Sequence, residues 1–239
     1  MKLNVGGILY IVLYTKYKIH MKESNRERKN EIKYHITLNE EQKEAKRLIR
    51  ENQIVVITGR AGCGKSLVSA QTALDFLFKK ECDQILVTRA AVEVGHSLGF
   101  LPGGLNEKFD PYLEAFQENL MKCHDKVKVL ELINDGKVKA LPVQFIRGKT
   151  VDDILVVEEA QNMTKAEMLA VLTRLGKTGK IIINGDNEQK DIKDPFNGLS
   201  YVIELSKKIK EIKWIKLKEN HRSDLVGKIL DYEYSKSTA

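Results

Sequence analysis

Residues 59–66 read Gly-Arg-Ala-Gly-Cys-Gly-Lys-Ser and match the pattern G-x-x-x-x-G-K-[ST] of a phosphate-binding loop, or P-loop. Residues 54–58 before it are an apolar, β-branched run typical of a buried strand, and the residues from 67 onward are apolar enough for a long helix. Glycines let such a loop turn its N–H groups onto phosphate oxygens, and the helix N-terminus adds partial positive charge. The alternative is a plain glycine-rich turn, but the flanking strand and helix favour a nucleotide site.

The P-loop pattern assigns roles to individual residues. The Lys65 ammonium is expected to reach the β- and γ-phosphates, and the Ser66 hydroxyl is expected to bind Mg²⁺. Cys63 holds a variable position at which mainly the backbone faces phosphate, so we interpret it as a tolerated small residue and not as a nucleophile. The expected nucleotide-binding residues of the loop are Gly59, Arg60, Ala61, Gly62, Cys63, Gly64, Lys65 and Ser66.

A bound nucleotide also needs acidic residues facing its terminal phosphate. The apolar strand at residues 154–157 leads into Glu158 and Glu159. By position, Glu158 is expected to bind Mg²⁺ through water, and Glu159 to orient or deprotonate the attacking water. Gln189 follows the next apolar strand, and its amide is expected to sense the γ-phosphate. Paired acids also occur on plain surfaces, but their place after a buried strand favours the catalytic interpretation.

Strands and helices alternate along the rest of the chain, and the strands are continuous apolar runs. This pattern predicts the α/β class, with a mostly parallel sheet flanked by helices. Helices are expected to begin at Asp110-Pro111 and at a capping box of Thr164 and Glu167, the second one ending at Gly176 and burying Leu169. Strands are expected at residues 54–58, 84–88, 142–146, 154–157, 181–183 and 212–217.

The sequence divides into an N-terminal extension, residues 1–35, and one α/β domain, residues 36–239. Residues 5–14 are a nearly continuous apolar run that is too short to span a bilayer and lacks an A-x-A cleavage site. This run is either an extra strand or a translated leader upstream of a true start at Met21. Residues 22–34 are dense in charge and are expected to form a solvated, mobile arm. We expect no association with a membrane.

The chain carries 40 lysines and arginines against 33 aspartates and glutamates, a net charge of +7. This excess suits a polyanionic partner, nucleic acid first, although an indifferent basic surface accounts for it equally well. The three cysteines and five histidines show no ligand spacing. A disulfide framework or zinc site is therefore not expected, and the cytoplasm is the expected location.

Seven further strings after the P-loop resemble, in the same order, those of the PhoH-like ATPases. They are VTRAAVEVG at 87–95, LGFLPG at 98–103, EKFDPY at 107–112, RGKT at 147–150, EAQN at 159–162, LTRLG at 172–176 and GDNEQ at 185–189. The resemblance covers roughly residues 40–200. It implies a RecA- or helicase-like core, similar to the first motor domain of superfamily-one helicases. It also implies an ATPase that uses ATP and Mg²⁺, acts with RNA or single-stranded DNA, and forms a ring, such as a hexamer.

Two positions depart from that family pattern. Glu158 stands where the family usually has Asp, which moves the carboxylate by about one C–C bond and is expected to slow turnover without ending nucleotide binding. Ala90 stands where proline is usual. Some relatives carry a PIN-type nuclease domain, for which this sequence has no room, so no nuclease activity is expected.

Two more segments resemble helicase motifs. Residues 38–42 end in Gln42, which either reads adenine through its amide or caps the helix that Asn39 opens. Residues 217–223 contain Arg222, the candidate arginine finger, with Arg147 and Arg174 as rivals from family-matching strings and a plain surface arginine as the alternative. Because one domain cannot close over ATP alone, the finger is expected from a neighbouring subunit of a homo-oligomer.

The predicted function is therefore that of a cytoplasmic, Mg²⁺-dependent ATPase acting with nucleic acid. One alternative is a nucleotide-regulated nucleic-acid-binding protein with little or no hydrolysis. The other is a helicase, which is less expected because the sequence contains no second motor domain.

Overall fold

The computed structural model describes residues 32–90, 105–192, 194, 196–221 and 223–236. The chain forms two compact units, Met1–Lys33 and Tyr34–Ala239, and the second contains all the elements below. The expected extra strand at residues 5–14, residues 22–31 of the expected arm at 22–34, and Arg222 lie outside the described residues. The arm was wrongly extended to Tyr34, which is half-buried and whose hydroxyl donates to Asp75.

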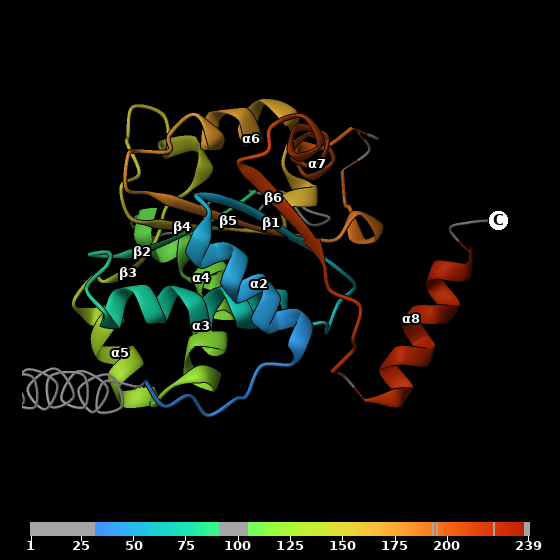
Figure 1. The fold of residues 1–239 in the computed structure, drawn as a ribbon, viewed down its shortest axis with the longest axis horizontal. Coiled ribbons are helices and arrows are strands. Elements are labelled where there is room, and N and C mark those ends of the chain that lie inside the picture. Colours follow the sequence, from blue (N-terminus) through green and yellow to red (C-terminus); the bar gives the residue numbers. More distant parts are fainter. Residues whose placement is uncertain (1–31, 91–104, 193, 195, 222, 237–239) are drawn as a thin grey trace, which may run out of the picture. The chain divides into compact units, whose positions relative to one another are not determined.

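The fold centres on a six-stranded sheet in which every paired strand is parallel (Figure 1). The strand order is β3-β2-β4-β5-β1-β6, so β4, β5 and β1 are neighbours in the middle of the sheet. This arrangement confirms the predicted α/β class. The strands are β1 (Ile54–Thr58), β2 (Ile85–Arg89), β3 (Val138–Ala140), β4 (Ile154–Glu158), β5 (Lys180–Gly185) and β6 (Ile212–Lys216).

Helices cover both faces of the sheet, with α2 to α5 on one face and α6 and α7 on the other (Figure 1). Val55 and Ile57 of β1 face the first layer and Val56 faces the second, which is why the strands read as unbroken apolar runs. The helices are α2 (Glu40–Glu51), α3 (Lys65–Phe78), α4 (Leu105–Cys123), α5 (Lys126–Asn134), α6 (Lys165–Leu172), α7 (Gly198–Lys208) and α8 (Asp224–Lys236).

Three predicted boundaries were wrong. The edge strand is β3, and the expected strand at 142–146 is instead a 3-10 turn, η1 (Val143–Phe145), because the N–H of Phe145 bonds back to the Pro142 carbonyl. Helix α4 begins at Leu105, ahead of the expected Asp110. Helix α6 ends at Leu172 because the Thr173 hydroxyl bonds to the Leu169 carbonyl and competes with the next turn.

Leu169 itself was expected inside and is 45% exposed, whereas Met168 and Val171 are fully buried. No helix among the described residues is long and apolar enough to cross a membrane.

Candidate active site

The candidate site lies where β4, β5 and β1 end, at the carboxyl edge of the sheet. The P-loop follows β1, Glu158 is the last residue of β4, and Gly185 closes β5 opposite Thr58. Parallel strands bring their carboxyl ends to one edge, and ligands of open α/β sheets bind there. The register thus places three separate sequence motifs around one point.

The P-loop backbone has the conformation that its glycines permit. Gly64 has φ +86° and is the N-cap of α3, and an added Cβ there would lie 2.3 Å from Nε2 of Gln42. Lys65 opens the helix, and its ammonium donates to the carbonyls of Gly59 at 2.6 Å and Arg60 at 3.3 Å. The loop is therefore closed by its own lysine, beside the helix N-terminus that favours anions.

Ser66 and Glu158 meet across the site. The Ser66 hydroxyl donates to Oε2 of Glu158 at 2.8 Å, and Nδ2 of Asn184 donates to Oε1 at 2.8 Å. Asn184 is in turn held by the Ser69 hydroxyl, which donates to its Oδ1 at 3.0 Å. Both oxygens of the Glu158 carboxylate are thus held by partners on α3 and β5.

Burial raises the pKa of Glu158 to about 7. The hydrogen bonds from Asn184 and Ser66 act against this shift, the neighbouring charge of Glu159 adds to it, and the Lys65 ammonium opposes it. A cation bound at this carboxylate would favour its charged form, because it supplies the countercharge that burial removes.

Glu159 begins the turn η2 (Ala160–Asn162) in the left-handed region, at φ +50°. Few residues other than glycine adopt this conformation, and such strain is held by surrounding contacts. Gln161 supplies them, because its amide nitrogen donates to Oε2 of Glu159 and to the Gln189 carbonyl, while its oxygen accepts from the Asp186 N–H. Buried Gln161 therefore joins Glu159 to the turn η3 (Asn187–Gln189).

One open cavity of about 580 Å³ connects these groups. It is of the size that small-molecule ligands occupy. The predicted site residues that line it are Gln42, Ala61, Gly62, Gly64, Lys65, Ser66, Glu158, Glu159 and Gln189. Asn184 and Gly185, from the same segment as Gln189, line it as well. The lining residues that were not predicted from sequence are Ile36, Thr37, Leu67, Asn119, Lys122 and His221.

Gln42 forms the predicted capping box, since its N–H bonds to the Asn39 side chain and its Oε1 accepts from the Asn39 N–H. Its Nε2 also donates to the Cys63 carbonyl at 3.2 Å, which ties α2 to the P-loop. The two interpretations are compatible in space, because this capping residue also lines the cavity. Its adenine contact stays a prediction.

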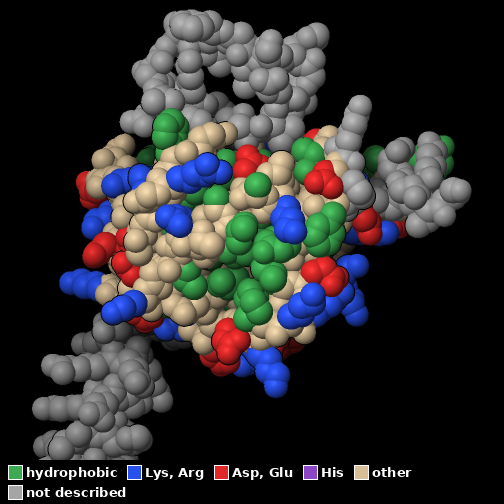
Figure 2. Space-filling model, turned by 90° about the horizontal axis from the view of Figure 1, so that it is seen from above, with side chains coloured by type: hydrophobic (Ala, Val, Ile, Leu, Met, Phe, Trp, Pro, Cys, Tyr) green, Lys and Arg blue, Asp and Glu red, His purple; other side chains and the backbone are tan. Residues whose placement is uncertain are grey.

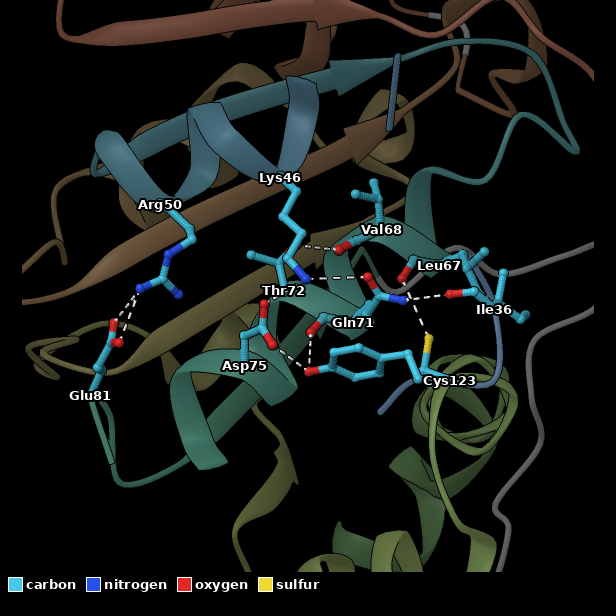
Figure 3. Close-up of polar contacts among 11 residues, drawn as sticks. Ile36, Lys46, Arg50, Leu67, Val68, Gln71, Thr72, Asp75, Glu81 and Cys123 are labelled. Atoms are coloured by element: carbon cyan, nitrogen blue, oxygen red, sulfur yellow. Dashed lines mark hydrogen bonds and ion pairs between the residues drawn. The ribbon is translucent and has the colours of Figure 1, made fainter. Parts of the chain in front are cut away.

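The far end of the cavity is held by a buried polar network (Figure 3). Nε2 of Gln71 donates to the Ile36 carbonyl at 3.0 Å, and Lys46 bonds to Oε1 of Gln71 and pairs with Asp75 at 2.5 Å. The Tyr34 hydroxyl donates to the same carboxylate at 2.6 Å. These contacts fix the segment before α2, including the cavity residues Ile36 and Thr37, against α3.

Gly59, Arg60 and Cys63 do not line the cavity, unlike the other P-loop residues. The Gly59 carbonyl instead accepts a hydrogen bond from the Lys65 ammonium. The Arg60 side chain turns away from the cavity and pairs with Glu188 of η3 and Asp231 of α8. Cys63 is buried, and burial raises the pKa of its thiol, which agrees with its interpretation as a small inert residue. The rival fingers Arg147 and Arg174 are not among the described residues that line the cavity.

The donor set suits Mg²⁺. This ion takes oxygen ligands, usually one or two protein side chains completed by water and substrate phosphates. The Ser66 hydroxyl and the Glu158 carboxylate are such a pair, 2.8 Å apart. The described residues contain no group of three or more His, Cys, Asp or Glu side chains able to hold a metal, and a site of this kind needs none.

Comparison with known proteins identifies the family of this chain. The family model described as "PhoH-like protein" matches residues 36–233. The chain belongs to the PhoH-like family. It is 39% identical over 194 residues to a PhoH-like protein of Bacillus subtilis, covering 80% of this chain and 61% of the relative, and 35% identical over 196 residues to one of Synechocystis, covering 80% and 60%. Protein PhoH of Escherichia coli K12 is 37% identical over 170 residues, covering 70% and 48%.

This PhoH-like chain thus spans about half to three fifths of the length of these curated relatives. Solved structures similar to it include the large terminase of a thermophilic bacteriophage, with a TM-score of 0.48 and 9% identity over 76% of this chain and 46% of that one. The Pif1 helicase of Candida albicans has a TM-score of 0.43 and 17% identity over 82% and 43%. The family assignment rests on the sequence relatives and the family model.

Proposed function

We propose that this PhoH-like protein is a Mg²⁺-dependent ATPase that acts with RNA or single-stranded DNA. The observation that supports the proposal most is the meeting of five side chains around one cavity at the carboxyl edge of the sheet. They are Lys65, Ser66, Glu158, Glu159 and Gln189.

The P-loop end of the cavity supplies charge complementary to a triphosphate. The N–H groups ahead of α3 and the Lys65 ammonium bind phosphate oxygens. When it does so, Lys65 gives up its hydrogen bonds to the carbonyls of Gly59 and Arg60. Ser66 and Glu158 hold Mg²⁺, which neutralises negative charge on the phosphates when bound. Together these residues position the terminal phosphate for attack by water.

Glu159 acts on the water. Its carboxylate lines the cavity beside Glu158, and the amide of Gln161 fixes its direction. A carboxylate so placed accepts a hydrogen bond from the water and aims it in line with the bond to the leaving ADP oxygen. The Gln189 carbonyl accepts a hydrogen bond from the Gln161 amide. Gln189 is the residue proposed to sense whether the γ-phosphate is present.

Two observations support a nucleic-acid partner. The net charge is +7, and the face that carries α6 and α7 gathers apolar side chains in its middle, with charged side chains of both signs, lysines and arginines among them, around it (Figure 2). The ammonium of Lys165, on α6, lies 5.1 Å from the ring centre of Tyr201, on α7, and 6.0 Å from that of Phe196, which precedes α7 and is 43% exposed. Aromatic rings beside a cation suit stacking of unpaired bases. The sequence analysis had not predicted this cluster, because its members come from separate segments of the chain.

We also propose a homo-oligomer, such as a hexameric ring, in which a neighbour supplies an arginine to the γ-phosphate. Arg222 directly follows His221, whose N–H bonds to the Gly62 carbonyl at the cavity, so the segment that leads to Arg222 is anchored at the P-loop. Such a finger contributes about 10³–10⁵ in rate. Arg222→Ala, compared with Arg147→Ala and Arg174→Ala, identifies which arginine acts. The cytoplasm, which supplies ATP, is the proposed location.

Steady-state hydrolysis of ATP tests the proposal. Wild type should turn over ATP only with Mg²⁺, faster with RNA or single-stranded DNA, and Glu159→Gln should lower kcat by about 10²–10⁴-fold while ATP still binds. Background turnover by both proteins, with ATP binding retained, would replace the enzyme by the second candidate, a nucleotide-regulated binding protein. The longer side chain of Glu158, where the family usually has Asp, favours that candidate.

A further inference from the structure

We propose that Asn184 and Ser69 are positioning residues, which together fix the Glu158 carboxylate toward Ser66 so that the pair is ready to bind Mg²⁺. The inference rests on the proposed function, since it concerns the same Mg²⁺ site. It assigns a role to Ser69, which is buried and does not line the cavity, and to Asn184, which lines the cavity with its amide bonded to Glu158.

Burial makes the hydrogen bonds of Asn184 and Ser69 costly to lose. Asn184 is 1% exposed and Ser69 is fully buried, so neither side chain can replace a lost hydrogen bond with bulk water. Asn184 lies on β5, Ser69 lies on α3 and Glu158 ends β4. The three residues therefore connect the P-loop helix to the two central strands through side chains alone.

The chemistry of the groups sets the direction of each bond. A carboxylate only accepts hydrogen bonds, so Asn184 must present its Nδ2 to Glu158, at 2.8 Å. Its Oδ1 then faces Ser69, which has to donate, at 3.0 Å. The Glu158 carboxylate thus sets which way the Asn184 amide stands, and the Ser69 hydroxyl, which donates to Oδ1, holds it there. The amide occupies Oε1 of Glu158 and leaves Oε2 for Ser66.

A glutamate at this position needs the hydrogen bond from Asn184 to fix the direction of its carboxylate. Its side chain has one more rotatable bond than aspartate, and the Lys65 ammonium is close enough to act on the charge of Glu158. With one oxygen held by Asn184, the other stays 2.8 Å from the Ser66 hydroxyl. Without Asn184, the carboxylate is free to turn from Ser66, and binding Mg²⁺ then requires it to be ordered first.

The Mg²⁺ dependence of ATP affinity tests this role, because a merely structural role would leave it unchanged. Calorimetry measures ATP binding to wild type, Ser69→Ala and Asn184→Ala, each with Mg²⁺ and with chelator. Both variants should bind ATP without Mg²⁺ as wild type does. The gain in affinity that Mg²⁺ gives wild type should fall by about 10-fold in Asn184→Ala and by less in Ser69→Ala, the range expected for partners that orient metal ligands.

Thr72→Val is the matched control, since Thr72 is a buried hydroxyl on the same helix that bonds only to the Val68 carbonyl of its own helix among the contacts described. Its Mg²⁺ gain should equal that of wild type. If Asn184→Ala does not fold, the Mg²⁺ gain of Ser69→Ala alone tests the proposal. This variant is expected to fold, because Ser69 lies on α3 and alanine is favourable in a helix.

A full Mg²⁺ gain in both variants would overturn the proposal and leave the ATPase standing. Wild type that binds ATP with no Mg²⁺ gain would overturn the Mg²⁺ site itself, and with it this inference.

Discussion

The two ends of the cavity are built in different ways. The phosphate end consists of the P-loop and the ends of β4 and β5, whose backbones are fixed by the central strands of the sheet. The opposite end consists of Ile36, Thr37, Gln42, Asn119, Lys122 and His221, which come from three distant segments, 36–42, 119–122 and 221, and line the cavity through tertiary contacts. At the first end, the strands and the P-loop fix the positions of charged side chains. The second end has few charged side chains, and hydrogen bonds between segments hold its shape. Under the proposed function, the triphosphate would bind at the first end and the nucleoside at the second.

Gly64 lies between Gln42 of the second end and Lys65 of the first, so its substitution should change ATP affinity more than any other. A methyl group on Gly64 would meet Nε2 of Gln42 and force the loop from φ +86°. We expect Gly64→Ala to reduce ATP affinity by about 100-fold or more and to lower the free energy of unfolding by about 2–3 kcal/mol. Gly148→Ala is the control, because its φ is +81° but nothing lies within 4 Å of the added Cβ. It should cost about 1–2 kcal/mol and leave ATP binding intact.

The second prediction concerns pH at the phosphate end. Because the folded-state pKa of Glu158 is raised from 4.5 to about 7, the folded protein holds a proton between these values that the unfolded chain has released. Its contribution to stability is full below pH 4.5 and is lost as pH rises through 7. Without nucleotide or Mg²⁺, Glu158→Gln should be more stable than wild type by on the order of 2 kcal/mol at pH 8, and equally stable near pH 4.5.

Urea unfolding at a series of pH values measures this difference. Glu204 is the control, because Lys207 lowers the pKa of its carboxyl, so Glu204→Gln should not stabilise the protein at pH 8. A constant gap between Glu158→Gln and wild type across this pH range would show that the Glu158 carboxyl is not strained by burial.

The third prediction separates the two roles of Gln42 at the nucleoside end. Gln42→Ala should lose its helix cap, at about 1 kcal/mol, and should also reduce the preference for ATP over GTP by about 10-fold. Glu167→Ala breaks the same kind of capping box at α6, which does not line the cavity. An unchanged preference in Gln42→Ala would leave Gln42 with the capping role alone.

The smallest effect is expected at Tyr34, behind the nucleoside end. Tyr34→Phe removes one hydrogen bond to Asp75, which keeps its ion pair with Lys46. Thermal unfolding should show a loss of about 1 kcal/mol, and ATP affinity should change by about 3-fold or less. A much larger loss of affinity would mean that the network of Figure 3 positions the nucleoside more tightly than its place behind the cavity suggests.

The phosphate end could be predicted from sequence because local rules specify it. The strand before the P-loop, the glycines and the acids after a buried strand each carry a short-range signal, and parallel pairing then brings β1, β4 and β5 together. The capping box of Gln42 was predicted for the same reason.

The nucleoside end could not be predicted, because no local pattern reports which distant segments meet. Asn119 and His221 are 102 positions apart; Asn119 reaches the cavity because α4 packs against α3, and His221 because its N–H bonds to the Gly62 carbonyl. The relay from Ser69 to Asn184 was missed for a similar reason, since each residue alone is an ordinary helix or strand position. The expected strand at 142–146 was wrong because Pro142 begins a 3-10 turn after the short β3 has already paired with β2.

Two lysines in one cavity allow the most direct test of how ATP lies. Calorimetric titration with ATP and Mg²⁺ should show one saturable site in wild type, a loss of about 100-fold in affinity for Lys65→Ala, and a change of about 3-fold or less for Lys122→Ala. Equal losses in the two variants, a greater loss in Lys122→Ala, or no ATP uptake by folded wild type would contradict a triphosphate bound at the P-loop.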